Sequence, residues 1–153
     1  MNVLLISFLL FKSSNIKVEI KGSVHYINGK TYPGMGIYVN YNYLEYFGAR
    51  GGVEWVKIDD LNQVSVPLEA LFYPLKYGKI FSPYLGLGIG GYFLKGENIS
   101  EITLGYQAFA GFKFNFQKLD AGFEIKYVVP DIGEGKGQWV YSGTIGGGLV
   151  LEF

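Results

Sequence analysis

The sequence of 153 residues contains no cysteine, a single histidine and only five prolines. Disulfide cross-links, thiol catalysis and zinc sites built from Cys and His therefore lack their ligands. An excess of positive charge is also absent, because 13 Lys and Arg balance 13 Asp and Glu. Nucleic-acid binding, and docking on anionic lipid through a basic helix, both depend on such an excess. We therefore expect no nucleic-acid partner, and no cofactor is predicted.

Glycine and aromatic residues are abundant instead. The chain has 23 Gly, 13 Tyr, 12 Phe and 2 Trp, whereas charged residues make up only 17%. Such a composition is too apolar for a disordered chain and too rich in glycine for a helical bundle. The length suits one domain. An all-β fold is the class that this composition favours.

An apolar run occupies positions 3–11, near the amino terminus. Its length matches the core of a signal peptide and is half of the roughly 20 residues that a spanning helix needs. No Lys or Arg precedes the run and no Ala-x-Ala site follows it, so an ordinary apolar strand or short helix is the alternative. We predict that residues 1–15 are a signal peptide or its remnant and that residues 16–153 form the exported, folded domain.

From Ile16 onward, apolar residues recur with a period of two, which is the periodicity of strands with two unlike faces. Turn residues such as Asn28 and Gly29 separate these stretches. Four of the connections (28–33, 59–62, 95–101 and 130–138) are expected to form short loops at one end. Pro67 falls inside a strand, which predicts a bulge or irregular pairing there. The eight predicted strands are 16–27, 34–44, 49–58, 63–74, 84–94, 102–116, 119–129 and 139–153.

Alternate positions along these strands differ sharply in polarity. One face consists of apolar residues, with Lys57 as its only charged member. The other face holds five cations and six anions, and many of its remaining positions are glycine. The charged residues of this polar face are Lys17, Glu19, Lys21, Arg50, Glu54, Glu69, Lys113, Asp120, Glu124, Lys126 and Glu152.

The width of an eight-stranded barrel decides which face lies inside. Its interior is just wide enough to be filled by side chains, so the glycine-rich polar face fits there better than the bulky apolar face. Tilted strands of about 9–11 residues also suffice to cross a bilayer. We therefore predict an eight-stranded antiparallel up-and-down transmembrane β-barrel with both termini on the periplasmic side. A soluble lipocalin-like barrel, with its apolar face around an apolar ligand, is the alternative.

Charges inside so narrow a lumen are expected to pair, because an isolated buried ion is costly. A two-residue hairpin at 117–118 would set Lys113 diagonal to both Asp120 and Glu124. Lys21 and Lys126 are the candidate cations for Glu54 and Glu69, which lie near mid-depth. We predict an ion-pair lattice that plugs the lumen and leaves no wide pore. An ion-conducting path is the alternative.

Aromatic residues collect toward the strand ends. Tyr and Trp are enriched where a membrane protein meets the two interfaces, and transmembrane barrels carry aromatic girdles there. We therefore predict membrane-interface positions for Tyr41, Tyr43, Phe112, Phe114, Phe116, Tyr127, Trp139 and Tyr141.

Residues 66–74 (VPLEALFYP) and 83–92 (PYLGLGIGGY) resemble paired strands of the small bacterial outer-membrane β-barrel family, which includes relatives of outer-membrane proteins A and X. The carboxy-terminal residues Leu149, Leu151 and Phe153 are similar to the signal read by the barrel-assembly machinery. The resemblance covers residues 16–153. It implies a monomer in the bacterial outer membrane, surrounded by outer-membrane lipid and inserted by that machinery, with a structural role in the envelope. The short loops depart from the long ones of adhesive members.

His25 lies two residues from Ser23 on the polar face. Some members of the family that this chain resembles modify lipid A with a His, a Ser and an acidic residue, so a lipid A-modifying enzyme is the alternative function. No nucleophile elbow or oxyanion signature accompanies the two residues. Glu54 and Glu69 have the composition of an acid/base pair but no cleft for a substrate. We predict a solvated histidine at the rim of the barrel and no enzymatic activity.

Overall fold

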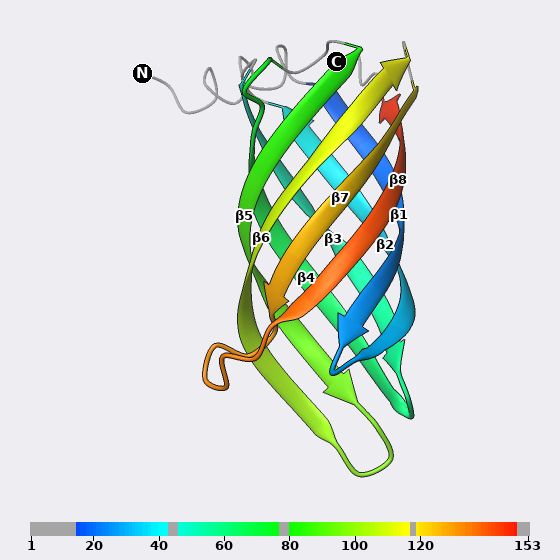
Figure 1. The fold of residues 1–153 in the computed structure, drawn as a ribbon, viewed down its shortest axis with the longest axis vertical. Coiled ribbons are helices and arrows are strands. Elements are labelled where there is room, and N and C mark those ends of the chain that lie inside the picture. The colour runs from blue at the N-terminus through cyan, green and yellow to red at the C-terminus, as the bar shows by residue number, and fades with distance from the viewer. Residues whose placement is uncertain (1–14, 43–45, 77–79, 117–118, 150–153) are drawn as a thin grey trace, which may run out of the picture.

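The computed structural model describes residues 15–42, 46–76, 80–116 and 119–149, which form one closed β-barrel (Figure 1). Each strand pairs with its sequence neighbours in antiparallel fashion, and β1 closes the barrel by pairing with β8. The predicted eight-stranded antiparallel barrel is thus confirmed. The strands are β1 (Asn15–Ile27), β2 (Lys30–Asn42), β3 (Phe47–Ile58), β4 (Leu61–Phe72), β5 (Phe81–Lys95), β6 (Ser100–Phe116), β7 (Leu119–Val129) and β8 (Gln138–Leu149).

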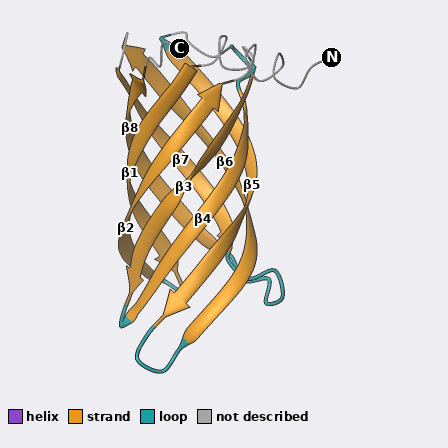
Figure 2. Ribbon diagram, turned by 180° about the vertical axis from the view of Figure 1, so that it is seen from behind, coloured by secondary structure: helices purple, strands orange, loops and turns teal. Residues whose placement is uncertain are grey.

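The barrel has two unlike ends. At one, here called the terminal end, β1 begins at Asn15 and β8 ends at Leu149. At the other, the hairpin end, lie the connections β1–β2, β3–β4, β5–β6 and β7–β8, drawn as loops in Figure 2. The residues described include no helix that is both long enough and apolar enough to cross a membrane.

The connections at the hairpin end contain fewer residues than the hydrophobic pattern predicts. Ile27 pairs directly with Lys30, which leaves Asn28 and Gly29 as a two-residue turn with φ of 51° and 80°. Asn-Gly is the preferred sequence for such a turn because both positions need positive φ. β2 therefore begins at Lys30 rather than at the predicted residue 34. Backbone pairing continues beyond the point where apolar alternation stops.

Pro67 does interrupt the ladder between β3 and β4. The paired residues resume from Gly51–Leu68 to Glu54–Ser65 without a change of register. Pro67 has no N–H to donate, which accounts for the missing rungs. The irregular pairing is confirmed, whereas a bulge is not formed because no extra residue is inserted.

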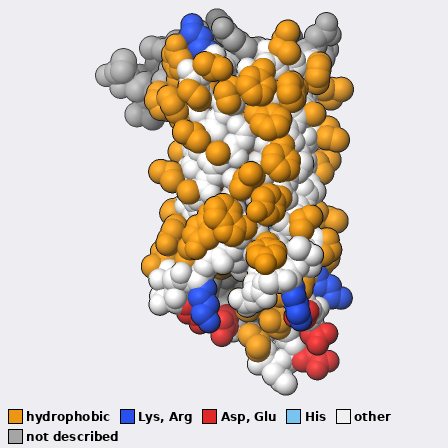
Figure 3. All heavy atoms as spheres, in the orientation of Figure 1, with side chains coloured by type: hydrophobic (Ala, Val, Ile, Leu, Met, Phe, Trp, Pro, Cys, Tyr) orange, Lys and Arg blue, Asp and Glu red, His pale blue; other side chains and the backbone are white. Residues whose placement is uncertain are grey.

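The two faces of the sheet are segregated as the alternation predicts. Hydrophobic side chains cover the outer wall, whereas charged side chains gather at the hairpin end (Figure 3). Charged and polar side chains point into the lumen and are buried there. Val129 is an exception among the described residues: continued alternation along β7 predicts an outward side chain, but Val129 is 1% exposed, next to Val128, which faces the lumen and is also buried. The alternation ends at this point because the following residues turn onto β6, where Ile132 N donates to Leu104 O at 3.0 Å.

Candidate functional site

The lumen contains five cations and five anions among the residues described. They come from β1, β3, β4, β6 and β7, and inward-facing glycines lie between them. All except Lys17 and Glu54 are among the buried residues of the chain. The sixth predicted anion, Glu152, lies outside the described residues. Ion pairs join these ten groups across the lumen and between neighbouring strands.

Arg50 on β3 is the centre of the network. Its Nε donates to Glu69 Oε1 at 2.8 Å and its Nη2 donates to Glu124 Oε1 at 2.7 Å. Its Nη1 lies 3.8 Å from Glu19 Oε2. The guanidinium carbon also lies 4.9 Å from the Tyr38 ring centroid and 4.7 Å from that of Phe109. A planar cation with five donors suits this position, because it binds several carboxylates and stacks on aromatic rings.

Lys126 connects the middle of the network to the hairpin-end half of the lumen. Its Nζ lies 2.9 Å from Glu69, 3.7 Å from Glu54 and 3.8 Å from Glu124. Lys21 donates to Glu124 at 2.6 Å. The structure thus brings Glu54 and Glu69 together around Lys126, so both carboxylates bind a buried cation rather than facing a cleft.

Hydrogen bonds from neutral side chains complete the shell around these carboxylates. Tyr38 donates to Glu54, and Tyr84 donates to Glu124 at 2.9 Å. Gln107 Nε2 donates to Glu69 Oε2 at 2.7 Å. A buried carboxylate whose lone pairs are occupied in this way avoids most of the penalty of an unsatisfied charge.

Lys113 pairs differently from the sequence-based expectation. Asn115 faces Asp120 and Lys113 faces Gly122, as the predicted hairpin requires, but the ammonium of Lys113 binds Glu19 on β1 instead of its diagonal neighbours. Asp120 binds Lys17 at 2.8 Å.

Two glycines make this crossing possible. A Cβ at Gly122 would lie 3.2 Å from Lys113 Cγ, and one at Gly146 would lie 3.0 Å from Glu19 Cγ. The side chains therefore cross β7 and β8 over bare backbone, which is a close approach that only glycine permits.

Apolar side chains close the lumen on both sides of the charged middle. Near the terminal end, Leu71, Tyr73, Tyr84 and Phe109 form one buried cluster. Near the hairpin end, Tyr92, Val128 and Val140 form another. Strand alternation places Tyr84 and Tyr92 on this inward face, as predicted, whereas the sequence reasoning did not name Leu71, Phe109, Val128 and Val140 among its members. The signal that reveals these four is their parity, because each stands at an alternate position of its strand that faces the lumen.

Ser23 and His25 lie in the lumen close to the hairpin end. Ser23 Oγ and His25 Nε2 are 3.1 Å apart, which is hydrogen-bond distance. The prediction of a solvated histidine is wrong, because His25 is buried among the side chains of the lumen, and its Nδ1 has no hydrogen-bond partner among the described residues. A Ser-His-acid triad requires a carboxylate at that nitrogen. Within residues 15–42, 46–76, 80–116 and 119–149 no group of three or more His, Cys, Asp and Glu side chains is arranged to hold a metal ion.

Solved structures with the same architecture include small bacterial outer-membrane β-barrels. The N-terminal β-barrel domain of Pseudomonas aeruginosa OprF matches with a TM-score of 0.70, over 87% of this chain and 97% of that domain, at 16% identity. Neisserial surface protein A matches with a TM-score of 0.59, over 89% and 97%, at 12% identity. This chain has the fold of the small outer-membrane β-barrels. No protein-family model and no curated protein sequence matches it.

The resemblance noted in the sequence is therefore confirmed at the level of fold. The same outer-membrane fold includes an enzyme, because the outer membrane enzyme PagL matches with a TM-score of 0.57 over 84% of this chain and 97% of that one, at 13% identity. This fold therefore does not determine whether the protein is an enzyme, and any activity has to be inferred from the side chains of the site.

The described members of the predicted interface aromatics lie toward the two ends of the barrel. Phe114, Phe116, Tyr127, Trp139 and Tyr141 are exposed on the outer wall, whereas Tyr41 and Phe112 are partly covered. Tyr127 and Trp139 contact each other, with ring centroids 5.0 Å apart. Tyr43 lies outside the described residues, as do Leu151 and Phe153 of the predicted assembly signal. Leu149 ends β8 and pairs with Ile16.

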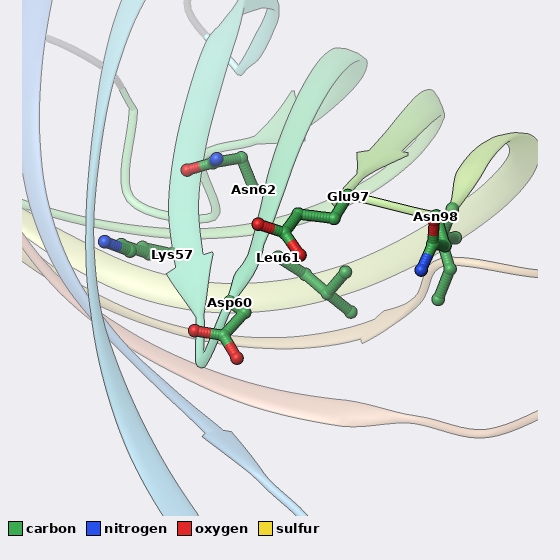
Figure 4. A pocket seen from close by; sticks show the side chains of 7 residues that line it. Lys57, Asp60, Leu61, Asn62, Glu97 and Asn98 are labelled. Atoms are coloured by element: carbon green, nitrogen blue, oxygen red, sulfur yellow. The ribbon is translucent and has the colours of Figure 1, made fainter.

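A pocket lies on the rim at the hairpin end, between the β3–β4 turn and the β5–β6 hairpin (Figure 4). Its volume is about 520 Å³. No part of the sequence reasoning pointed to it. The residues that line it are Lys57, Asp60, Leu61, Asn62, Glu97, Asn98 and Ile99.

Proposed function

We propose that this protein is an integral protein of the bacterial outer membrane with a non-enzymatic, structural role in the envelope. The observation that carries the proposal is the inverted distribution of polarity. Leu68, Leu87 and Ile89 are more than half exposed on the outer wall, whereas Arg50 and Glu124 are buried in the lumen. A barrel in water requires the opposite arrangement, and a barrel in lipid requires this one.

The lumen is proposed to be a plug rather than a channel. Seven of its largest side chains are less than 2% exposed, and ion pairs join strands that are not neighbours in the barrel, including β3 and β7 on opposite walls. A conducting path needs continuous water, whereas this lumen has apolar clusters on both sides of its charged layer. The seven residues are Arg50, Tyr38, Tyr84, Lys21, Lys113, Lys126 and Glu124.

Outer-membrane lipid and, during biogenesis, the barrel-assembly machinery are the proposed partners. Leu149, Leu151 and Phe153 are proposed as the assembly signal, because they continue in the sequence the period-two apolar pattern of β8. We propose that the folded protein is a monomer. A closed barrel supports this, because it leaves no strand edge for a second chain to pair with.

Refolding with and without a membrane mimic tests the proposal. Residues 16–153, denatured in urea, would be diluted in parallel into detergent micelles and into plain buffer. Circular dichroism, size-exclusion chromatography and gel mobility before and after boiling would follow each sample. We expect strand content and heat-dependent mobility only with detergent, and aggregation without it. A monodisperse, strand-rich monomer in plain buffer would instead support the soluble, ligand-binding alternative.

A lipid-modifying enzyme is the second candidate. The 3.1 Å contact between Ser23 Oγ and His25 Nε2 and the likeness to the outer membrane enzyme PagL favour it. The refolded protein would be incubated with lipid A, and the products would be analysed by mass spectrometry. We expect no change in lipid A. Loss of acyl chains that disappears in the Ser23→Ala variant would replace the structural role with an enzymatic one.

A further inference from the structure

The apolar outer wall is taller on β6 than on β3. Outward positions of β6 are apolar from Ile102 to Phe116, whereas those of β3 are uncharged only from Phe47 to Trp55 and are followed by Lys57. Strands of such a barrel are tilted by roughly 40°, so the stretch on β6 spans about 35 Å of height and that on β3 about 20 Å. The lipid-facing band of a transmembrane barrel is about 25 Å tall, which is too short for β6 if the barrel stands upright.

The two ends of this tall stretch lie on opposite faces of the barrel. Between Ile102 and Phe116 a tilted strand winds about 30 Å around a circumference of about 50 Å, which is more than half a turn. Figure 1 shows β6 winding around the wall between the terminal end and the hairpin end. Inclining a barrel in a membrane raises one face and lowers the opposite one. A single inclination therefore brings both ends of β6 toward the hydrocarbon, which is how a long apolar segment reduces hydrophobic mismatch.

The boundary of the apolar wall at the hairpin end slants around the barrel. One row of paired residues contains Trp55, Val64, Phe93 and Ile102. Along such a row each strand lies about 3 Å further toward the hairpin end than the strand before it. Figure 1 agrees, because the β5–β6 hairpin reaches beyond the β3–β4 turn. Ile102 thus lies about 9 Å beyond Trp55, whereas Lys57, two residues along β3, lies only about 5 Å beyond it.

Four exposed apolar side chains gather where the wall reaches furthest. On the β5–β6 hairpin, Phe93 is 41% exposed, Ile102 75% and Leu104 58%, and in the β7–β8 loop Ile132 is 53% exposed. Phe93 pairs with Ile102. Ile132 lies beside Leu104, because its N–H donates to Leu104 O at 3.0 Å. These four residues are here called the apolar lip.

The β7–β8 loop is fixed against the outer wall at both of its ends. At its start, Thr103 Oγ1 donates to Pro130 O at 2.7 Å. At its end, the Tyr127 ring lies so close to Gly137 that a Cβ there would overlap the ring. In Figures 1 and 2 the loop stands out sideways from the barrel. The loop therefore adds Ile132 to the apolar surface of the wall.

We propose that lipid covers the apolar lip and that the barrel is inclined in the membrane, with its hairpin end leaning toward the lip. The inference rests on the proposed insertion of the barrel. Lipid is the occupant that fits, because outward positions of β6 carry no charge between the wall and the lip. On the opposite face, Thr31 of β2 is exposed and polar although it lies about 2 Å closer to the terminal end than Ile102. The inclination moves Thr31 into water and Ile102 into lipid.

A single tryptophan on each face measures the inclination. Trp55→Phe with Trp139→Phe removes both native tryptophans, and Ile102→Trp or Thr31→Trp then adds one reporter to the full chain. Each variant would be refolded into phosphatidylcholine vesicles with and without bromine on the acyl chains, which quenches tryptophan fluorescence from the lipid. Acrylamide would quench it from the water. An upright barrel holds Thr31 closer to the hydrocarbon than Ile102, so the two orientations predict opposite orders of quenching.

We expect brominated lipid to quench the Ile102→Trp reporter more strongly than the Thr31→Trp reporter. Acrylamide should show the reverse order. The emission of the Ile102→Trp reporter should also lie at a shorter wavelength, because its indole is in lipid.

Removing apolar side chains from the lip tests whether the lip sets the inclination. Leu104→Ser with Ile132→Ser should bring the barrel closer to upright, so that quenching of the Thr31→Trp reporter by brominated lipid increases. Leu87→Ser with Ile145→Ser is the matched control, because it removes two apolar side chains that are each 68% exposed elsewhere on the wall. The control should leave the quenching of Thr31→Trp unchanged. An equal change in both pairs of variants would refute a special role of the lip.

A third reporter separates failure of this inference from failure of the membrane proposal. Leu68→Trp in the same background places the indole near mid-height of the wall, at a site that is 63% exposed. If brominated lipid does not quench it, the outer wall does not contact acyl chains and the membrane proposal itself fails. If Leu68→Trp is quenched but Thr31→Trp is quenched at least as strongly as Ile102→Trp, the barrel is inserted upright. The lipid-covered lip is then refuted, and a protein partner becomes the alternative occupant. Heat-dependent gel mobility would verify that each variant is folded.

Discussion

The lumen and the outer wall of this barrel differ in the side chains that they require. In the lumen each charged group needs a particular partner at a particular distance, as Arg50 has with Glu69 at 2.8 Å and Glu124 at 2.7 Å. With the proposed insertion into a membrane, any apolar side chain can occupy the outer wall, because lipid fits irregular surfaces. The difference predicts that the lumen tolerates few substitutions of any kind, whereas the wall rejects chiefly charge.

The largest expected effect is the loss of the central cation. Arg50→Met keeps a long apolar stem between Tyr38 and Phe109 but leaves three carboxylates without the guanidinium. Breaking a buried ion pair by removing one partner typically costs about 3–5 kcal/mol, and we expect a loss of that size in the free energy of unfolding. Urea unfolding in lipid vesicles, followed by gel mobility, would measure it. Lys30→Met, an exposed lysine at the hairpin end, is the control.

If Arg50→Met and Lys30→Met unfolded at the same urea concentration, the ion-pair network would contribute nothing net to stability. Lumen and wall would then differ in composition without differing in their tolerance of substitution.

A charge on the outer wall is the second test. Leu68 on β4 faces outward near mid-height and is 63% exposed. Arginine on the lipid face of a barrel costs about 2–4 kcal/mol at the bilayer midplane and about 0–1 kcal/mol near the interface. Leu68→Arg should therefore lower the free energy of unfolding in vesicles several times more than Ile102→Arg, whose site is 75% exposed near the hairpin end. Equal effects of the two substitutions would contradict a lipid-facing wall.

Strand alternation predicted much of this structure from the sequence. Period-two patterns placed eight strands, assigned Arg50 and Glu69 to one face, and set Asn115 opposite Asp120 across the β6–β7 hairpin. These are local properties, because alternation fixes the face of a residue and a tight turn fixes the register of the two strands it joins.

The partners across the lumen could not be predicted in this way. Lys113 reaches Glu19, which is 94 positions away in the sequence, because barrel closure sets β1 across from β6 and two glycines leave the path open. The tilt and stagger of a closed barrel decide which side chains meet, and neither is present in the pattern of one strand.

Strand ends at the rim were missed for a different reason. The apolar pattern of β5 stops at Phe93, so Lys95 was assigned to a loop, whereas backbone pairing continues to Lys95 and Ser100. Hydrophobic alternation marks the part of a strand with one apolar and one polar face, and backbone hydrogen bonding extends beyond it. The register of the paired strands therefore places Lys95 in β5, on the other side of Asn62 from Lys57.

Adding one methyl group to each face gives the smallest and most direct comparison. Gly86 faces the lumen opposite Phe109, and a Cβ there would overlap the Phe109 ring. Gly22 faces outward on β1, and a Cβ there would have nothing within 4 Å. Gly86→Ala should displace the ring on which Arg50 stacks and lower the free energy of unfolding by about 1–3 kcal/mol. Gly22→Ala should leave it unchanged or raise it by up to about 1 kcal/mol, because alanine restricts the unfolded chain.

Both glycine variants would be unfolded by urea in the same vesicles, so that the two free energies share one reference state. A similar loss in both would mean that glycine serves the backbone of the sheet at either position, through conformations that alanine disfavours. A loss confined to Gly86→Ala would show that glycine is required at position 86 because the lumen has no room there for a side chain. That outcome would separate the two faces by packing alone, because neither substitution changes any charge.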